Sequence, residues 1–253
     1  METTFYVNSP KIAAGITMKS DSRPEENNMA LHACANPADV IRNREHLAEL
    51  LHCEMGDLVC ARQTHSANFH HVTRADRGRG SISADNAIPD TDALYTFEPN
   101  LVLCSFTADC VPVIFSNEAS GLVGVIHSGW PGSTKEIAWK LFRHLIEKEH
   151  CSPKDFRIII GPAISQEKFE VDEDVYEKFK ALGYADDYIC YNSRTNKYHI
   201  DNQLTVKKQI ELAGIPADRI EVDRTCTYSS PDGFSYRENK KAGRHASFIM
   251  RKE

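Results

Sequence analysis

The sequence lacks any long hydrophobic run. Its 253 residues have a mean hydropathy of -0.44, and no apolar segment approaches the ~20 residues that a membrane-spanning helix needs. The longest candidate, residues 101–115, is interrupted by Asp109 and Pro112. The opening residues, METTFYVNSP, contain no basic segment followed by an apolar one, so they do not resemble a secretory signal. We therefore expect a cytoplasmic protein with no membrane span.

An excess of positive charge is also missing. Lys and Arg total 30 against 36 Asp and Glu, which gives a net charge of -6. Because proteins that bind nucleic acid non-specifically are usually basic, we expect no nucleic-acid partner. The charges are unevenly distributed, with eight acids and three bases in residues 165–190 but seven bases and three acids in residues 224–253. The acidic segment is typical of a solvated helix, whereas the basic one is interleaved with Gly, Ser and Tyr.

Paired cysteines are absent. The eight cysteines include no C-x-x-C pair, and several lie inside apolar runs. A chain of this length without a signal peptide is better interpreted as holding reduced thiols than as a disulfide scaffold. Internal repeats, low-complexity tracts and long linkers are missing too, so one domain over residues 1–253 is the simplest organisation.

Local signals predict four helices, each starting after a capping residue. The predicted capping residues are Asn36, which is followed by Pro37, and Ser133, Asp172 and Asp201. Gly183 and Gly214 are predicted to end the last two helices. The second start rests on the pattern Ser133-x-x-Glu136, which has the form of a capping box.

Short apolar runs between these helices predict strands that are covered on both faces. They span residues 58–61, 93–96, 101–106, 111–115, 122–127, 157–160 and 247–250. Residues 74–90 are rich in Gly, Asp and Arg and predict a long surface loop. The mixture of interleaved helices and strands predicts an α/β (α+β) fold.

The most suggestive local feature is the segment LVGVIHSGWPGSTKE at residues 122–136. A buried strand ends at His127, and a turn containing Gly129 and Gly132 leads to the helix predicted at Ser133. Glycines permit close backbone approach, and a helix start presents free N–H groups that suit an anion such as phosphate. The segment lacks the G-K-[ST] of a phosphate-binding loop, so an ordinary strand-to-helix turn remains the alternative.

Three side chains with metal-ligand chemistry follow predicted buried strands. They are His65 in QTHS, Cys110 in TADCVPV and His127. Two imidazoles and a thiolate make a three-ligand zinc site with an open fourth position. Their spacing has no local metal signature, so a buried structural cysteine and structural histidines remain open as alternatives.

Several motifs together resemble one known family. QTHS at 63–66, TADCVPV at 107–113, HSGWPGS at 127–133, IGPAI at 160–164 and SYREN…AGR at 235–244 occur in this order. The joint pattern is similar to the laccase-domain family of bacterial proteins, also called polyphenol-oxidase-like, and covers nearly the whole chain. Members of that family are understood as purine nucleoside phosphorylases that also deaminate adenosine.

The resemblance implies a single-domain four-layer αββα sandwich with mixed sheets. It also implies a catalytic zinc ion held by His65, Cys110 and His127, with copper as the alternative metal. The implied substrates are phosphate and adenosine, inosine, guanosine or 5′-methylthioadenosine. One departure matters here: the family commonly has a basic residue after Trp130, where this chain has Pro131.

The leading hypothesis is therefore a zinc-dependent purine nucleoside phosphorylase with adenosine deaminase activity, in which Asp109 is the candidate acid–base residue. A metal-free hydrolase with Cys110 as nucleophile and His127 as base uses the same residues. A multicopper phenol oxidase is disfavoured because the chain has no H-x-H pair. A non-enzymatic binding module has no direct support in the sequence.

Phosphate must be held without the missing basic residue. The candidates are the turn of Gly129, Gly132 and Ser133, together with Arg237 and Arg244 of the basic C-terminal segment. Arginine suits bidentate contact with an oxyanion. We favour Arg237 because Phe234 and Tyr236 flank it as anchors, with pairing to an acid of the helix after Asp172 as the structural alternative. A homodimer is a further expectation.

Overall fold

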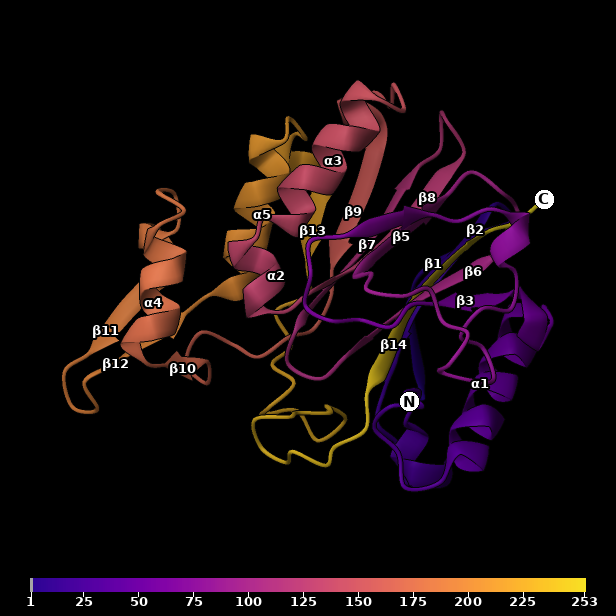
Figure 1. Cartoon of the computed structure of the whole chain (residues 1–253), viewed down its shortest axis with the longest axis horizontal. Coiled ribbons are helices and arrows are strands. Elements are labelled where there is room, and N and C mark those ends of the chain that lie inside the picture. The colour runs from indigo at the N-terminus through magenta and orange to yellow at the C-terminus, as the bar shows by residue number, and fades with distance from the viewer. Residues whose placement is uncertain (1) are drawn as a thin grey trace.

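Two β-sheets packed face to face form the centre of the computed structural model, which describes residues 2–253 (Figure 1). The first sheet has five strands and is antiparallel except where β3 and β6 run parallel. In spatial order its strands are β1 (Thr3–Asn8), β2 (Ile12–Thr17), β14 (His245–Arg251), β6 (Val102–Thr107) and β3 (Leu58–Cys60). The chain ends are thus in one sheet, because β14 pairs with β2.

The second sheet has six strands with an antiparallel centre and parallel edges. In order they are β13 (Ile220–Val222), β9 (Phe156–Ile160), β7 (Val111–Asn117), β8 (Leu122–Ser128), β5 (Ala93–Thr96) and β4 (Phe69–His71). Its inner face packs on the first sheet through a cluster of buried aliphatic side chains that includes Leu103, Ile114, Val125 and Ile249. Burial on both faces explains why these strands are nearly continuous apolar runs.

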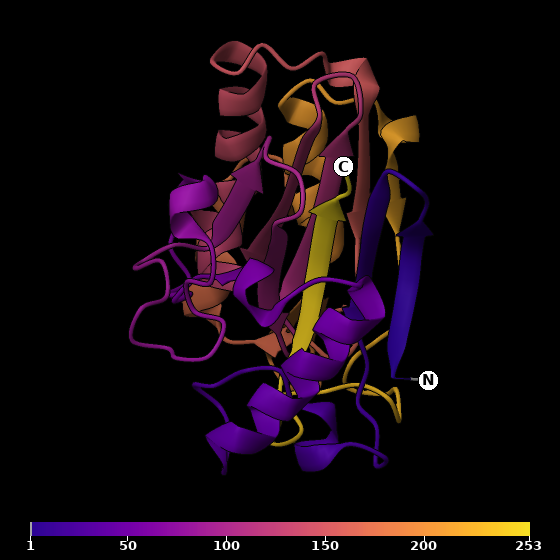
Figure 2. The ribbon, with the colours of Figure 1, turned by 90° about the vertical axis from the view of Figure 1, so that its right-hand side faces the viewer.

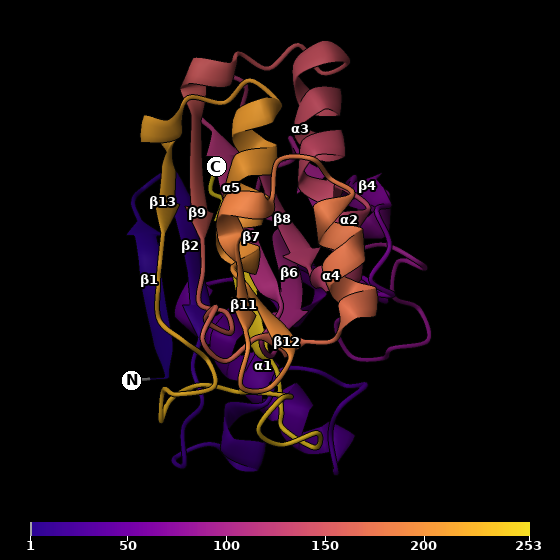
Figure 3. The same cartoon turned by 90° about the vertical axis from the view of Figure 1, so that its left-hand side faces the viewer.

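Helices cover the outer faces and complete the predicted αββα sandwich. The helix α1 (Pro37–Leu51) packs Leu47 and Leu51 on the first sheet, and Figure 2 shows it in purple crossing in front of β14. On the second sheet lie α3 (Ile137–Glu147) and α5 (Asn202–Leu212), and Figure 3 shows both helices on the viewer's side of that sheet. None of the helices within residues 2–253 combines the length and apolar character needed to traverse a bilayer.

Three of the four predicted helix starts are confirmed. The Asn36 side chain accepts a hydrogen bond from the Ala38 N–H at 3.2 Å, and Asp201 accepts one from the Leu204 N–H at 3.0 Å. The residue Asp172 precedes α4 (Glu173–Lys180), although its side chain makes no capping hydrogen bond. These caps could be predicted because they depend on residues adjacent in sequence.

The capping box predicted at Ser133 is wrong. Ser133 lies inside a short helix, α2 (Trp130–Thr134), where its N–H bonds to the carbonyl of Gly129 at 2.9 Å. The helix α3 begins only at Ile137, after Glu136 in the left-handed conformation with φ of 62°. The turn through Gly129 already supplies a helix start, so the serine is not needed as a cap.

A third, small sheet was not predicted. It consists of β10 (Glu170–Val171), β12 (Lys197–Ile200) and β11 (Ile189–Asn192), and it packs with α4 at one edge of the molecule, on the left of Figure 1. Phe179 of α4 is fully buried in the cluster that joins this unit to the rest. The strands β1, β2, β4 and β13 were missed too.

The surface loop predicted at residues 74–90 is anchored more firmly than its composition suggests. It contains a short 3-10 turn, Arg74–Asp76, and the side chains of Ser81 and Ile88 are buried. The fully buried guanidinium of Arg44 from α1 donates to the Gly80 and Ser81 carbonyls at 2.6 and 2.7 Å. A helix on one outer layer therefore holds the loop in place.

Candidate metal centre

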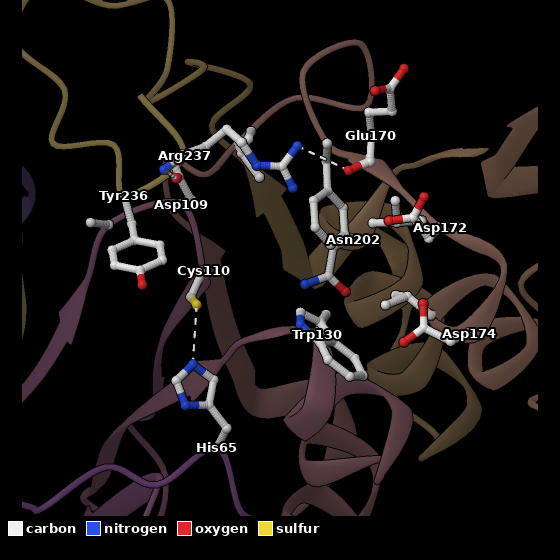
Figure 4. Close-up of a pocket in the computed structure, with 15 residues that line it drawn as sticks. His65, Asp109, Cys110, Trp130, Glu170, Asp172, Asp174, Asn202, Tyr236 and Arg237 are labelled. Atoms are coloured by element: carbon white, nitrogen blue, oxygen red, sulfur yellow. Dashed lines mark hydrogen bonds between the residues drawn. The ribbon is translucent and has the colours of Figure 1, made fainter. Parts of the chain in front are cut away.

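His65, Cys110 and His127 meet at one end of the two sheets. One potential ligand atom from each lies within 4.8 Å of the other two. Cys110 Sγ is 3.7 Å from His65 Nε2, and the two imidazole centroids are 4.7 Å apart (Figure 4 shows the His65–Cys110 pair). The structure thus brings together the three residues that were predicted from the sequence as metal ligands.

Strand pairing explains this convergence. The strands β3 and β6 run parallel, so the loops that carry His65 and Cys110 leave the first sheet at the same edge. In the antiparallel pair β7–β8, Val111 is opposite Ser128, which places Cys110 beside Gly129 and close to His127. Segments far apart in sequence therefore meet because of the register of two strand pairs.

Gly129 provides room for the ligands. A Cβ at this position would lie 2.4 Å from His65 Cδ2 and 2.9 Å from Cys110 Sγ, both far inside contact distance. Its φ of -67° is open to any residue, so close approach is what requires glycine here. The prediction that this glycine binds an anion is untested, but its structural role is to let two ligand side chains approach the backbone.

Asp92 orients His127 and was missed by the sequence analysis. Its Oδ1 lies 2.8 Å from His127 Nδ1, which leaves Nε2 of the ring for a metal ion. The same carboxylate accepts the N–H groups of His65 and Ser66 at 3.1 and 2.7 Å. Burial opposes the charge of Asp92, but His127 and Ser66 outweigh it and lower its pKa to about 2. A polar residue directly before the apolar run 93–96 was the available signal.

Gln63 fixes the segment that carries His65. Its amide nitrogen donates to the Phe106 carbonyl and its amide oxygen accepts from the Phe106 N–H, both at 2.8 Å. The side chain thus pairs with β6 as a neighbouring strand would. This explains the glutamine two residues before the histidine in the QTHS motif.

The thiol and the imidazole of the centre influence each other. Burial disfavours ionisation of Cys110, but the charge and hydrogen bonds of His127 and His65 outweigh it and lower the pKa of the thiol to about 6. Burial also opposes charge on His127, yet the Cys110 thiolate and Asp92 raise its pKa to about 9. The thiolate is the form of Cys110 that binds metal, whereas His127 must release its Nε2 proton when a metal ion binds.

The donor set fits a metal ion of the zinc or copper type. Two imidazole nitrogens and one thiolate suit zinc, and imidazole also suits copper. The aspartate behind His127 matches the carboxylate–histidine arrangement that commonly supports metal-bound histidines. Three protein ligands leave a coordination position free for a reacting group.

Two cavities meet at this centre. The first, of about 460 Å³, contains Trp130, Phe169 and Asn202 beside His65 and Cys110 (Figure 4). Acidic residues also line it, namely Asp109, Glu170, Asp172 and Asp174. The second, of about 380 Å³, is lined by all three candidate ligands together with His32, Gln63, Phe106, Ala108, Tyr236 and Arg244.

Asp109 holds the C-terminal loop in place. With φ of 81°, it turns the chain just before Cys110. Its carboxylate accepts hydrogen bonds from Thr227 Oγ1 at 2.7 Å, Ser235 Oγ at 3.0 Å and the Arg237 N–H at 2.7 Å. Asp109 thereby ties the loop that carries Arg237 and Arg244 to the metal-ligand turn.

The remaining predicted residues divide between the cavities and the interior. Arg237 lies in the first cavity and Arg244 in the second. Ser133 is fully buried, and its hydroxyl bonds to Ser128 Oγ at 2.8 Å, while Gly132 is buried beside the Ser66 carbonyl. The turn of Gly129, Gly132 and Ser133 therefore joins α2 to β8.

Residues 16–252 match the family described as multi-copper polyphenol oxidoreductase laccase, and the chain belongs to this family. It is 35% identical over 252 residues to the purine nucleoside phosphorylase YlmD of Bacillus subtilis (strain 168), covering 97% of this chain and 91% of that protein. It is 31% identical over 216 residues to adenosine deaminase RL5 of an unknown prokaryotic organism, covering 84% and 82%. The crystal structure of the hypothetical protein YfiH of Bacillus licheniformis matches with a TM-score of 0.90 at 34% identity, covering 97% of this chain and 98% of that one.

Proposed function

We propose that the protein is a zinc-dependent purine nucleoside phosphorylase that also deaminates adenosine. The observation that carries the proposal is the His65, Cys110 and His127 centre at the meeting point of two cavities. The names of the relatives, a phosphorylase and an adenosine deaminase, support both activities. Inosine, guanosine and 5′-methylthioadenosine are further proposed substrates, on the family resemblance.

The first cavity suits the nucleoside. Its volume of about 460 Å³ is within the range of small-molecule sites. Trp130 and Phe169 offer aromatic surface for a purine, and the carboxylates of Asp172 and Asp174 can accept hydrogen bonds from ribose hydroxyls. We propose that these residues bind the two halves of the substrate.

A zinc ion at this centre would act as a Lewis acid and lower the pKa of a water molecule bound beside the substrate. The chain's own contribution is positioning: Asp92 fixes the His127 ring, and Gln63 fixes the segment with His65. In deamination, water adds to C6 of adenosine and ammonia leaves, which gives inosine. In phosphorolysis, a phosphate oxygen bonds to C1′ while the C1′–N9 bond breaks and its electron pair leaves with the purine, which takes a proton.

The acid–base role of Asp109 stays a prediction, alongside its three hydrogen bonds to the C-terminal loop. We also propose that residues 1–253 act as one domain, because the centre takes ligands from segments attached to both sheets. The cytoplasmic location and the homodimer likewise stay predictions.

A metal-free cysteine hydrolase is the second candidate. It is favoured by the arrangement of Cys110, His127 and Asp92, which has the form of a nucleophile, a base and an orienting carboxylate. A multicopper oxidase has weaker support, because one such group of three ligands gathers within residues 2–253 and a multicopper centre needs several metal ions.

Metal content and product analysis together test the proposal. Protein purified without added metal should hold roughly one zinc ion per chain. With adenosine and phosphate it should release adenine, ribose 1-phosphate and some inosine. The variant Cys110→Ala should lose both activities and most of its zinc, whereas Cys190→Ala, at an exposed cysteine, should keep them.

Two outcomes would contradict this function. A metal-free preparation that turns over esters or amides, with no purine released, would favour the hydrolase. Nucleoside turnover retained in Cys110→Ala would exclude a shared metal mechanism.

A further inference from the structure

The two cavities at the metal centre differ in charge. Four carboxylates line the first cavity, those of Asp109, Glu170, Asp172 and Asp174. Among residues 2–253, no Asp or Glu lines the second cavity, whereas the guanidinium of Arg244 does. A phosphate dianion is repelled by nearby carboxylates and attracted by a guanidinium, so the second cavity is the more favourable place for it.

Arg237 in the first cavity is already engaged. Its Nη1 donates to the main-chain carbonyls of Lys168 and Glu170 at 3.2 and 2.9 Å, and Figure 4 shows the guanidinium turned toward Glu170. Its backbone N–H is bound by Asp109. The sequence alone leaves open a pairing of Arg237 with an acidic residue of α4. In the structure the Arg237 side chain binds these two main-chain carbonyls instead. Arg237 thus holds the start of β10 and the residues just before it against the C-terminal loop.

Within the described part of the chain, Arg237 and Arg244 both donate side-chain hydrogen bonds from Nη1 alone, so the difference between them is the lining of their cavities. Arg244 lies in the cavity that no Asp or Glu lines within residues 2–253. Among residues 2–253, its guanidinium donates hydrogen bonds from Nη1 alone, to the carbonyls of Ala242 and Gly243 next to it. Its Nε and Nη2 groups remain as a pair of donors of the kind that binds an oxyanion in a bidentate manner. The guanidinium stacks over Tyr236, with Cζ 5.5 Å from the ring centroid, and is half-buried. Stacking and burial hold the donors in place.

A third cavity, of about 570 Å³, connects Arg244 and His32 to a basic surface at Lys240 and Lys241. Glu25 and Glu26 line its other side. Glu26 pairs with Lys19 at 3.2 Å. Lys240, Lys241 and Arg244 outnumber the two glutamates in the lining. The lysines offer a positively charged entrance on the side of Arg244.

We propose that inorganic phosphate binds in the second cavity against Arg244, so that it reaches the centre from a different side than the nucleoside. This inference rests on the proposed phosphorolysis. The cavities share His65, Ala108, Cys110 and Tyr236, so a nucleoside in the first cavity can present C1′ at this shared boundary. Phosphate then attacks C1′ from the second cavity while the purine departs into the first, which is the in-line arrangement that a displacement requires.

Kinetics at varied phosphate concentration test the proposal. Arg244→Lys keeps the charge but loses the bidentate fork, so its KM for phosphate in inosine phosphorolysis should rise more than about tenfold. The midpoint of urea unfolding should be the same in this variant and in the wild-type protein, which reports that the fold is intact. Arg237→Lys should leave the phosphate KM within about twofold, as should the control Arg194→Lys on an exposed turn.

Binding of inorganic phosphate to the zinc-loaded protein, measured by calorimetry, separates this inference from the proposed function. If the wild-type protein binds phosphate and Arg244→Lys does not, the phosphate site at Arg244 is confirmed. This holds even if no purine is released and the proposed phosphorolysis is wrong. If Arg237→Lys rather than Arg244→Lys weakens phosphate binding or raises its KM, the site is in the first cavity and the inference is wrong. Equal phosphate binding in all variants would also overturn it.

Discussion

Gly129 and Asp92 show, at the scale of single residues, how much the metal centre depends on groups that bind no metal. Gly129 has no side chain, which leaves room for the side chains of His65 and Cys110 beside it. Asp92 fixes the ring of His127. Both act on ligand geometry. Mutation of such supporting residues commonly lowers metal affinity by about 10- to 100-fold.

Gly129→Ala should therefore weaken metal binding with little effect on the fold. The added Cβ would meet His65 and Cys110 at 2.4 and 2.9 Å, and the exposed His65 ring can swing away from it. We expect zinc affinity to fall by about 10- to 100-fold, measured by competition with a chromophoric chelator. The free energy of unfolding of the metal-free protein should change by less than about 1 kcal/mol, because φ at this position suits alanine.

The matched control is Gly56→Ala. A Cβ there would have its nearest neighbour, the guanidinium carbon of Arg77, at 3.7 Å, an ordinary contact distance. This variant should bind zinc as the wild-type protein does. If Gly129→Ala kept full zinc affinity, the close approach at Gly129 would have no role in ligand geometry.

At the scale of elements, one side chain of α1 connects three separate segments. The Arg44 guanidinium is fully buried and donates to the carbonyls of Met29, Gly80 and Ser81. Its Cζ lies 4.7 Å from the ring centroid of Phe106, which lines the second cavity. The helix thus supports both the 74–90 loop and one wall of the site.

Arg44→Ala should destabilise the protein strongly. It leaves three buried carbonyls without their donor and opens a void beside Phe106, and each unsatisfied group costs about 1–3 kcal/mol. We expect the free energy of unfolding to fall by at least about 3 kcal/mol, measured by urea denaturation. Arg42→Ala, on the exposed side of the same helix, should cost at most about 0.5 kcal/mol. Similar losses in both variants would show that the three carbonyls find other partners.

At the scale of the whole molecule, His245 joins three parts of the chain near the site. Its Nε2 accepts from the Phe234 N–H, and its Nδ1 donates to the Thr17 carbonyl, both at 2.7 Å. The ring must be neutral to do both. Burial, together with the charge of Arg244, lowers the pKa of His245 to about 4.

This lowered pKa makes stability depend on pH in a defined direction. The unfolded chain takes up a proton at His245 near its ordinary pKa of 6.5, whereas the folded protein excludes it down to about 4. The stabilisation is therefore complete above pH 6.5 and is lost as the pH falls from 6.5 to about 4, by up to about 3 kcal/mol. Burial lowers the pKa of His32 to about 4 as well, so it acts in the same direction.

Urea unfolding at several pH values checks this prediction. The free energy of unfolding of the wild-type protein should fall between about pH 6.5 and about pH 4, and His245→Gln should reduce that fall by up to about 3 kcal/mol. The difference between the two proteins isolates His245, because the other titrating groups are common to both. Parallel curves would mean that His245 is protonated in the folded state as readily as in the unfolded one.

Local patterns in the sequence determined much of the fold. The caps at Asn36 and Asp201 and the apolar runs of β5 to β9 depend on residues a few positions apart, so their signals survive in any tertiary context. The same holds for the choice of candidate ligands, since His65, Cys110 and His127 are chemically distinctive at the ends of apolar runs. The family resemblance then implied the four-layer architecture.

Only the tertiary structure decided which groups surround the metal centre. Asp92 lies beside His127 because β5 pairs with β8 in one register, and Arg237 and Arg244 separate into different cavities because of how Asp109 ties down the C-terminal loop. Strand register, side-chain direction and the meeting of cavities depend on contacts between residues far apart in sequence. Periodicity and capping patterns extend over only a few residues, so they cannot predict contacts between residues far apart in sequence.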